Sequence, residues 1–268
     1  MPSFKRIAAI LLRQYYLMRG SAARVVPLFA WVTVDIVLWG FITRYLNHVS
    51  HAGFNFVPAL LGAVLLWDFL TRVMQGVTMT FFEDVWSRNF LNIFASPLSL
   101  SEYLTGLVGS SIVTSVVGLV VMLLMATLAF GLSYFVYGLM FVPFILILFL
   151  SGIALGIFGS ALVLRLGPAA EWFVWPIPAL VSPFAGVFYP LSVLPTWMHA
   201  IAWLLPPAYV FEGMRALVAH QEFSLALLAI GGGLAVFYVL LAGWTFTHVY
   251  RRAVRTGLIA RYSAETVN

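Results

Sequence analysis

The stretch from Glu83 to Tyr103 reads EDVWSRNFLNIFASPLSLSEY, and it decides the fold. It is a charged and aromatic segment that lies between two long apolar runs, 56–82 and 103–130. Each run exceeds the ~20 residues that a helix needs to cross the hydrocarbon core of a bilayer. The pattern therefore predicts two membrane-spanning helices joined by an amphipathic segment outside the hydrocarbon.

The composition also indicates a membrane protein. Hydrophobic residues make up 63% of the chain and charged residues 9%, and the mean hydropathy is +1.02, whereas soluble domains carry about 25% charged residues. We predict an all-α membrane protein with one transmembrane domain over residues 1–268. The net charge of +5 comes from basic residues that flank apolar runs, so we expect no nucleic-acid partner. The chain has no cysteine, and its five histidines show no ligand spacing, so we expect no metal site.

Six membrane spans are predicted, at residues 25–43, 56–82, 103–130, 135–164, 172–189 and 225–249. The fifth contains Pro176, Pro178 and Pro183. The following segment, 190–220, is apolar as well, but its prolines divide it into pieces of roughly ten residues, which are too short to cross at 1.5 Å per residue. We predict a short re-entrant helical hairpin there, dipping in from the outer face.

The basic residues predict the orientation, because Lys and Arg concentrate on the cytoplasmic side. With both termini cytoplasmic, only Arg44 and Arg215 face outward, and Arg72 lies within a span. The basic residues then on the inside are Lys5, Arg6, Arg13, Arg19, Arg24, Arg88, Arg165, Arg251, Arg252, Arg255 and Arg261.

The first 24 residues have helical periodicity, with an apolar stripe opposite Arg6 and Arg13. The stripe consists of Phe4, Ile7, Ala8, Leu11, Tyr15 and Met18. This pattern predicts an amphipathic helix in the headgroup plane of the membrane. A cytosolic helix that packs on a partner has the same pattern.

The opening stretch predicts a short cytoplasmic helix over 83–98, which ends at Pro97 because proline disfavours helical geometry at the residue before it. It could rest in the headgroups, or it could dock into a groove of a cytoplasmic partner with its aromatic face as the anchor. The candidate contact residues are Glu83, Asp84, Trp86, Arg88, Phe90, Ile93 and Phe94.

Three charged residues fall within predicted spans: Asp35, Asp68 and Arg72. Each costs about 2.5 to 3.5 kcal/mol at a span centre on insertion scales. Asp68 and Arg72 are four residues apart and share a helix face. They could form a neutralised pair that fixes the packing of the first two spans, or they could serve as a proton relay or contact a substrate.

No phosphate-binding loop and no catalytic motif occurs, so we expect no enzymatic site in the chain itself. The predicted outer hairpin is rich in aromatic residues, which either form an interfacial belt or line the exit of a lipid-like cargo. Its candidate residues are Trp197, Trp203, Tyr209, Glu212 and Arg215.

The order of these features resembles a known family. The helix between spans two and three ends in SPLSLSEYLTG, and the outer segment reads YPLSVLPTWMHAIAWLLPPAYVFEGMR from Tyr189 to Arg215. Its P-x-x-Y-x-x-E-x-x-R ending falls on Pro206, Tyr209, Glu212 and Arg215. Over essentially its full length the chain resembles the integral-membrane permease subunit of ATP-binding-cassette exporters of the second permease type.

The resemblance implies a permease in the bacterial cytoplasmic membrane that exports an amphipathic, lipid-like or glycan-type compound. It implies a homodimer formed through the first and fifth spans, surrounded by membrane lipids. Two separate ATPase subunits would bind ATP and magnesium and would contact 83–98 as the coupling helix, while the outer hairpin would cap the exit. Two alternatives remain: a proton-coupled secondary transporter that uses Asp35 or Asp68, and a membrane assembly factor that moves nothing.

Overall fold

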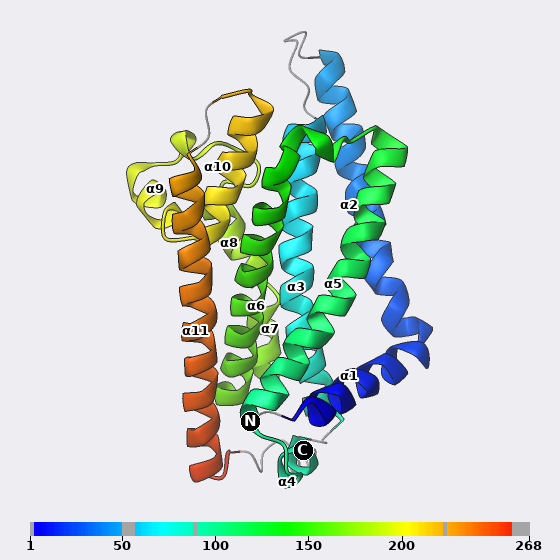
Figure 1. Ribbon diagram of the computed structural model, residues 1–268, viewed down its shortest axis with the longest axis vertical. Coiled ribbons are helices and arrows are strands. Elements are labelled where there is room, and N and C mark those ends of the chain that lie inside the picture. The colour runs from blue at the N-terminus through cyan, green and yellow to red at the C-terminus, as the bar shows by residue number, and fades with distance from the viewer. Residues whose placement is uncertain (1–2, 50–56, 88–89, 222–223, 259–268) are drawn as a thin grey trace.

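The computed structural model describes residues 3–49, 57–87, 90–221 and 224–258, and these residues form helices and turns with no strand among them. Long helices stand side by side along the long axis, and α1 lies across one end (Figure 1). The first half consists of α1 (Phe4–Arg19), α2 (Ala22–Val49), η1 (Val57–Leu61), α3 (Gly62–Trp86), α4 (Phe90–Ala95) and α5 (Leu100–Phe130). The second half consists of η2 (Tyr134–Met140), α6 (Phe141–Leu166), η3 (Pro168–Ala170), α7 (Glu171–Val174), α8 (Ile177–Ala185), η4 (Leu191–Val193), α9 (Thr196–Ala202), α10 (Pro206–Val218) and α11 (Leu225–Arg255).

Four helices in the described part of the chain are long and apolar enough to cross a membrane: Val57–Trp86, Leu100–Phe130, Tyr134–Leu166 and Leu225–Arg255. They match the second, third, fourth and sixth predicted spans, and they confirm an all-helical membrane protein. α2, with 28 residues, runs beside them but is not one of the four (Figure 1). The six-span topology therefore stays a prediction.

The fifth predicted span, 172–189, is divided in the structure. α7 has four residues and α8 has nine. The break falls at Trp175 and Pro176, and Pro178 occupies the first turn of α8. Proline has no N–H to donate to the helical ladder, and its ring clashes with the preceding turn. The two short helices follow one another toward the end that carries α9 and α10 (Figure 1).

α3 is the centre of the fold. Most of its residues are buried, and it packs against α5 on one side and α6 on the other. Gly152 and Gly156 of α6 allow this close packing, because a Cβ at Gly152 would lie 2.7 Å from the Leu70 carbonyl oxygen and one at Gly156 would lie 2.7 Å from Val77 Cβ. The G-x-x-x-G spacing is the sequence signal for such an approach of two membrane helices, and it was not among the predicted features.

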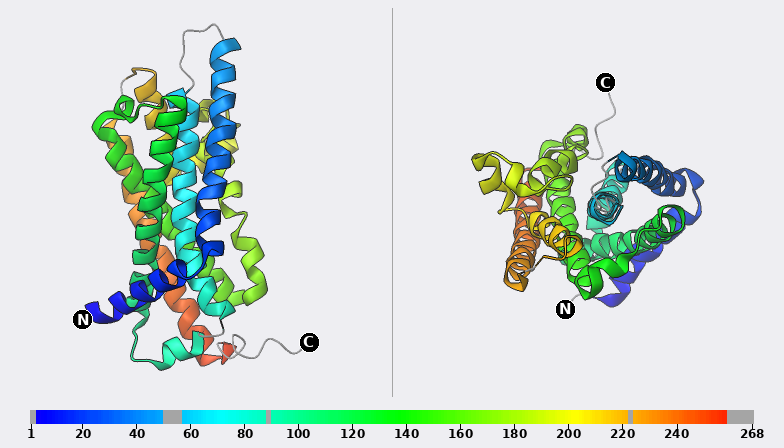
Figure 2. Two further views of the ribbon diagram at one scale, coloured as in Figure 1. Left: turned by 90° about the vertical axis from the view of Figure 1, so that its right-hand side faces the viewer. Right: turned by 90° about the horizontal axis from the view of Figure 1, so that it is seen from above.

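α1 lies across the bundle at the end that also carries α4 and the C-terminal end of α11 (Figures 1 and 2). Its inner face packs on α5, where a Cβ at Gly106 would lie 2.7 Å from Ile10 Cδ1. Phe4, Leu12 and Tyr15 are exposed on its other side. α1 therefore combines helix packing with an exposed apolar surface, which is the surface that a headgroup-plane helix presents to lipid.

Candidate functional site

The candidate site lies at the end of the molecule where α3, α4, α5 and α1 meet (Figure 2). The predicted segment 83–98 is two elements here: Glu83–Trp86 form the last turn of α3, and α4 contains only the six residues Phe90–Ala95. α4 ends at Ala95, directly before Ser96 and Pro97, so the helix ends where Pro97 predicts. Arg88 lies outside the described residues, and the side chains of Phe90 and Phe94 are likewise outside them.

Asp84 points into the protein. Its side chain is 1% exposed and forms an ion pair with Arg13 of α1, and the Tyr103 hydroxyl of α5 donates a hydrogen bond of 2.8 Å to its second oxygen. A buried carboxylate is tolerated when it is paired and hydrogen-bonded in this way. Asp84 therefore ties α1, α3 and α5 together, and it is not a surface contact for a partner.

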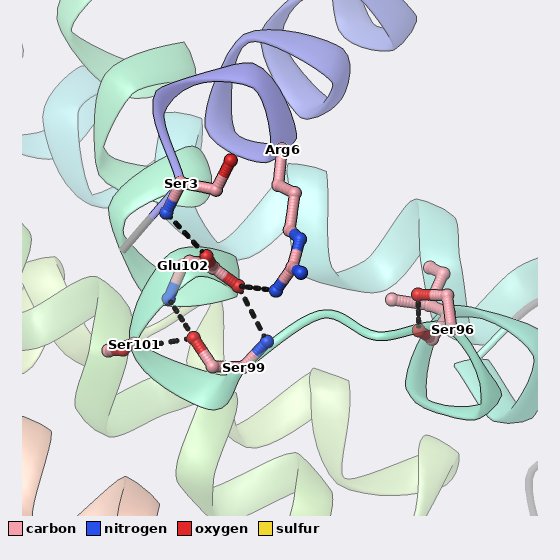
Figure 3. Close-up of polar contacts among 7 residues, drawn as sticks. Ser3, Arg6, Ser96, Ser99, Ser101 and Glu102 are labelled. Carbon is pink, nitrogen blue, oxygen red and sulfur yellow. Dashed lines mark hydrogen bonds and ion pairs between the residues drawn. The ribbon is translucent and has the colours of Figure 1, made fainter. Parts of the chain in front are cut away.

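A second carboxylate, Glu102, joins α1 to the start of α5, and it was not among the predicted site residues. Its oxygens accept hydrogen bonds from the Ser3 N–H at 2.6 Å and the Ser99 N–H at 2.8 Å, and Arg6 Nη1 lies 3.3 Å away (Figure 3). In return, the Ser99 hydroxyl accepts from the Glu102 N–H, which completes a capping box at the start of α5. The signal was present in the sequence as S-x-x-E ahead of an apolar run.

Trp86 connects α3 to α7. Its indole Nε1 donates a 2.8 Å hydrogen bond to Glu171 Oε2, and its ring lies 5.8 Å from that of Phe82. Half of the Trp86 side chain is exposed. The residue is thus partly available to a partner and at the same time linked to the first residue of α7. Glu83 lies in the same turn and is partly buried.

Ile93 of α4 lines a groove of about 320 Å³ between α1, α4 and the start of α5. Arg6 and Arg13 stand on its α1 side, and Pro97, Leu98 and Tyr103 complete the apolar lining. The groove opens on the outside of the molecule beside α4. It is a surface with an apolar floor and two cations, each already joined to a carboxylate of the bundle.

The three charged residues of the predicted spans lie where α2, α3 and α5 come together. Asp68 and Arg72 are one turn apart on α3 and attract one another, and Asp35 of α2 is near enough to repel Asp68. Arg72 crosses directly over Gly118 of α5, where an added Cβ would lie 2.4 Å from Arg72 Cδ. Asp68 Oδ2 and Arg72 Nε are buried and make no hydrogen bond within the described residues. The charges of this cluster are only partly compensated. Both predicted roles stay open: a neutralised pair that fixes the helix packing, and a proton relay or substrate contact.

Glu212 and Arg215, from the motif of the predicted outer hairpin, hold a turn. Glu212 accepts hydrogen bonds from the Leu191 N–H at 2.7 Å and from Arg215 Nη2 at 2.8 Å, and Arg215 Nη1 donates to the Gly186 carbonyl at 2.6 Å. Gly186 ends α8 with φ of +64°, a conformation that favours glycine. α10 thereby fastens the turn after α8.

The aromatic residues of the predicted outer hairpin have different surroundings. The Tyr209 hydroxyl donates to the Trp203 carbonyl at 2.8 Å, and the two rings meet edge to face. Burial raises the pKa of Tyr209 above its ordinary value. Trp197 is 62% exposed and touches Phe184. Trp197 alone of the five predicted hairpin residues therefore presents a largely free surface.

No group of three His, Asp or Glu side chains within the described ranges could hold a metal ion.

A sequence model of the ABC-2 type transporter family matches residues 7–218. No curated protein matches the chain.

Proposed function

The chain belongs to the ABC-2 type transporter family, and we propose that it is the permease subunit of an ATP-driven exporter. Its cargo is an amphipathic, lipid-like or glycan-type compound that crosses the bacterial cytoplasmic membrane. Separate ATPase subunits bind ATP and magnesium, since the sequence of this chain contains no phosphate-binding loop. The end that carries α1 and α4 faces the cytoplasm.

The observation that carries this proposal is the way α4 is attached to the bundle. α4 connects α3 to α5 along the chain, and both helices are fastened to α1 through Asp84 and Glu102 on either side of it. A force on α4 therefore moves α1, α3 and α5 together. A coupling element needs this property, because only contacts that differ between two ATPase states can shift the permease between two states.

The Trp86–Glu171 hydrogen bond extends this linkage to α7 and α8. α8 leads to the turn that Glu212 and Arg215 of α10 hold. A continuous series of contacts thus joins the end that carries α4 to the predicted outer hairpin. This connection supports the proposed role of the hairpin as a cap of the exit.

We further propose that two copies pair through α2 and the α7–α8 segment. α2 has an exposed apolar face formed by Val34, Val37, Leu38, Phe41 and Tyr45. Trp172, Phe173 and Leu180 are exposed on α7 and α8. Such faces suit a second permease copy as well as membrane lipid.

The test uses the complex purified from its own membranes with the ATPase subunit that accompanies it. Trp86→Phe keeps the ring and removes the N–H donor, while Trp86→Asp places a second negative charge beside Glu171. We expect Trp86→Asp to lower ATP hydrolysis to the rate of the ATPase subunit alone, and Trp86→Phe to give an intermediate rate.

The matched control is Trp244→Phe on the exposed side of α11, which should leave hydrolysis unchanged. Full hydrolysis and transport by the Trp86→Asp complex would contradict the coupling role. Transport by the isolated chain, driven by a proton gradient without any ATPase, would instead support the use of Asp35 or Asp68.

A further inference from the structure

A groove of about 550 Å³ runs between the first turn of α5 and the second half of α11, away from the α4 groove. Leu100 and Leu104 form its α5 wall, and Val239 and Leu240 form its α11 wall. Gly243 continues the α11 wall, and an added Cβ there would meet nothing within 4 Å. This volume falls in the range of about 300–1,000 Å³ that is typical of ligand sites.

The side chains with polar groups lie toward one end of the groove: Thr247, Tyr250 and Arg251 of α11 and Ser101 of α5. Ser101 and Arg251 line it at the end that carries α1 and α4, and both side chains are exposed. None of the ion pairs among the described residues includes Arg251. Glu102, the carboxylate next to Ser101, is occupied by Ser3, Arg6 and Ser99. Arg251 is therefore a cation available at the mouth of an apolar groove.

This distribution of charge matches an anionic amphiphile. The apolar walls belong to α5 and α11, two of the helices long and apolar enough to cross the membrane, so acyl chains surround the groove. An acyl chain that enters gains little from burial, because the lipid it leaves is as apolar as leucine. The headgroup must then supply the selectivity, and a guanidinium is the preferred partner of a phosphate.

We propose that the α5–α11 groove binds one anionic phospholipid from the leaflet beside α4. One acyl chain lies along Leu104, Leu240 and Gly243, and the phosphate lies at Arg251 and the Ser101 hydroxyl. The lipid is a resident of the permease and not its cargo, so this site is independent of the proposed direction of transport. It holds α11 to the start of α5, next to the elements that contact the ATPase.

The experiment is native mass spectrometry of the purified full chain, after equal amounts of phosphatidylglycerol and phosphatidylcholine with identical acyl chains are added. The wild-type protein should retain one phosphatidylglycerol in preference to phosphatidylcholine. Arg251→Gln should lower this preference about fivefold, as expected for about 1 kcal/mol per basic residue near an anionic headgroup. Arg252→Gln removes the same charge outside the groove and should retain the wild-type preference.

A second pair of variants tests the groove itself. Gly243→Leu fills it and should abolish retention of both lipids, whereas Gly233→Leu, on the same helix and equally free of neighbours, should not. Glycerol phosphate, which is a headgroup without acyl chains, should fail to displace the bound lipid at equal concentration.

Equal retention of the two lipids by the wild-type protein would overturn the proposal. So would the same loss in Arg251→Gln and Arg252→Gln, undiminished binding in Gly243→Leu, or displacement by glycerol phosphate. A second copy of the chain could occupy the groove in place of a lipid. The wild-type protein would then be a dimer with no lipid bound, and Gly243→Leu would dissociate the dimer. This result would also overturn the proposal.

Discussion

Two buried carboxylates hold together the end of the protein that carries α1 and α4. Asp84 and Glu102 come from different helices, but each accepts hydrogen bonds from other elements and each is joined to an arginine of α1. Hydrogen bonds to charged groups contribute about 1.5–3 kcal/mol each. Their loss should therefore be visible in the stability of the purified protein.

Tyr103→Phe removes the hydroxyl that donates to Asp84 and leaves the buried ring in place. Because one oxygen of Asp84 then loses its donor, we expect a destabilisation of about 1–3 kcal/mol. The shift of the thermal midpoint is measured by heating the protein in detergent and quantifying the remaining folded species by size-exclusion chromatography. Thr105→Val on the exposed side of the same helix is the control, and an equal midpoint for Tyr103→Phe and Thr105→Val would contradict the role of this hydrogen bond.

Glu102→Ala should release α1 from the start of α5. The change removes the acceptor for Ser3, Arg6 and Ser99 and eliminates half of the capping box, and loss of a helix cap costs about 0.5–2 kcal/mol. Hydrogen exchange should become faster in residues 4–19 and at the first turn of α5. Arg19→Gln, at the exposed end of α1, should leave the exchange unchanged. Unaltered protection of α1 in Glu102→Ala would rule out this anchoring.

At the scale of elements, the sequence predicts some helices well and others poorly. The third, fourth and sixth predicted spans agree with α5, the η2–α6 helix and α11 to within a few residues at most boundaries. Each of these spans is a continuous apolar run that ends at glycine or at charged residues.

The segment 83–98 was less predictable. Glu83 and Asp84 resemble the start of a surface helix, but Arg13, seventy-one residues away, pairs with Asp84, and α3 continues to Trp86.

The contacts of the candidate site could not be predicted for the same reason. Trp86–Glu171 and Arg6–Glu102 join residues far apart in the chain, and a single sequence contains no local signal for such pairs. Pro176 and Pro178 were visible, but only the structure shows that the helix is divided there. The capping box at Ser99 and the G-x-x-x-G of α6 were local signals that could have been read.

The close contact of α6 with α3 yields a sharp prediction. In Gly156→Leu the new side chain would begin 2.7 Å from Val77 Cβ and 2.9 Å from the Met74 carbonyl oxygen. Overpacking costs about 1–3 kcal/mol, and more where backbone must move. We expect loss of the monodisperse species in size-exclusion chromatography. Gly233→Leu, which meets open space, should behave as wild type, and equal yields of both variants would show that α3 and α6 are not closely packed.

At the scale of the whole molecule, the topology can be mapped directly because the chain contains no cysteine. Single cysteines introduced at Ala95, Leu166 and Thr256 should react with a membrane-impermeant maleimide only after the cells are opened. Cysteines at Val193 and Trp197 should react in intact cells. All five positions are exposed. Labelling of Leu166→Cys and Trp197→Cys from the same side would contradict a crossing by α7 and α8.

The central claim is that a separate ATPase drives this permease through α4. The most direct measurement places a photoreactive amino acid at exposed Ala95 of α4 and, as a control, at Trp197 on the opposite end, and then identifies the cross-linked proteins in native membranes. The account predicts that Ala95 cross-links to an ATP-binding subunit with a phosphate-binding loop and that Trp197 does not. Cross-linking of Ala95 to lipid alone, in membranes where the protein transports its cargo, would contradict the account.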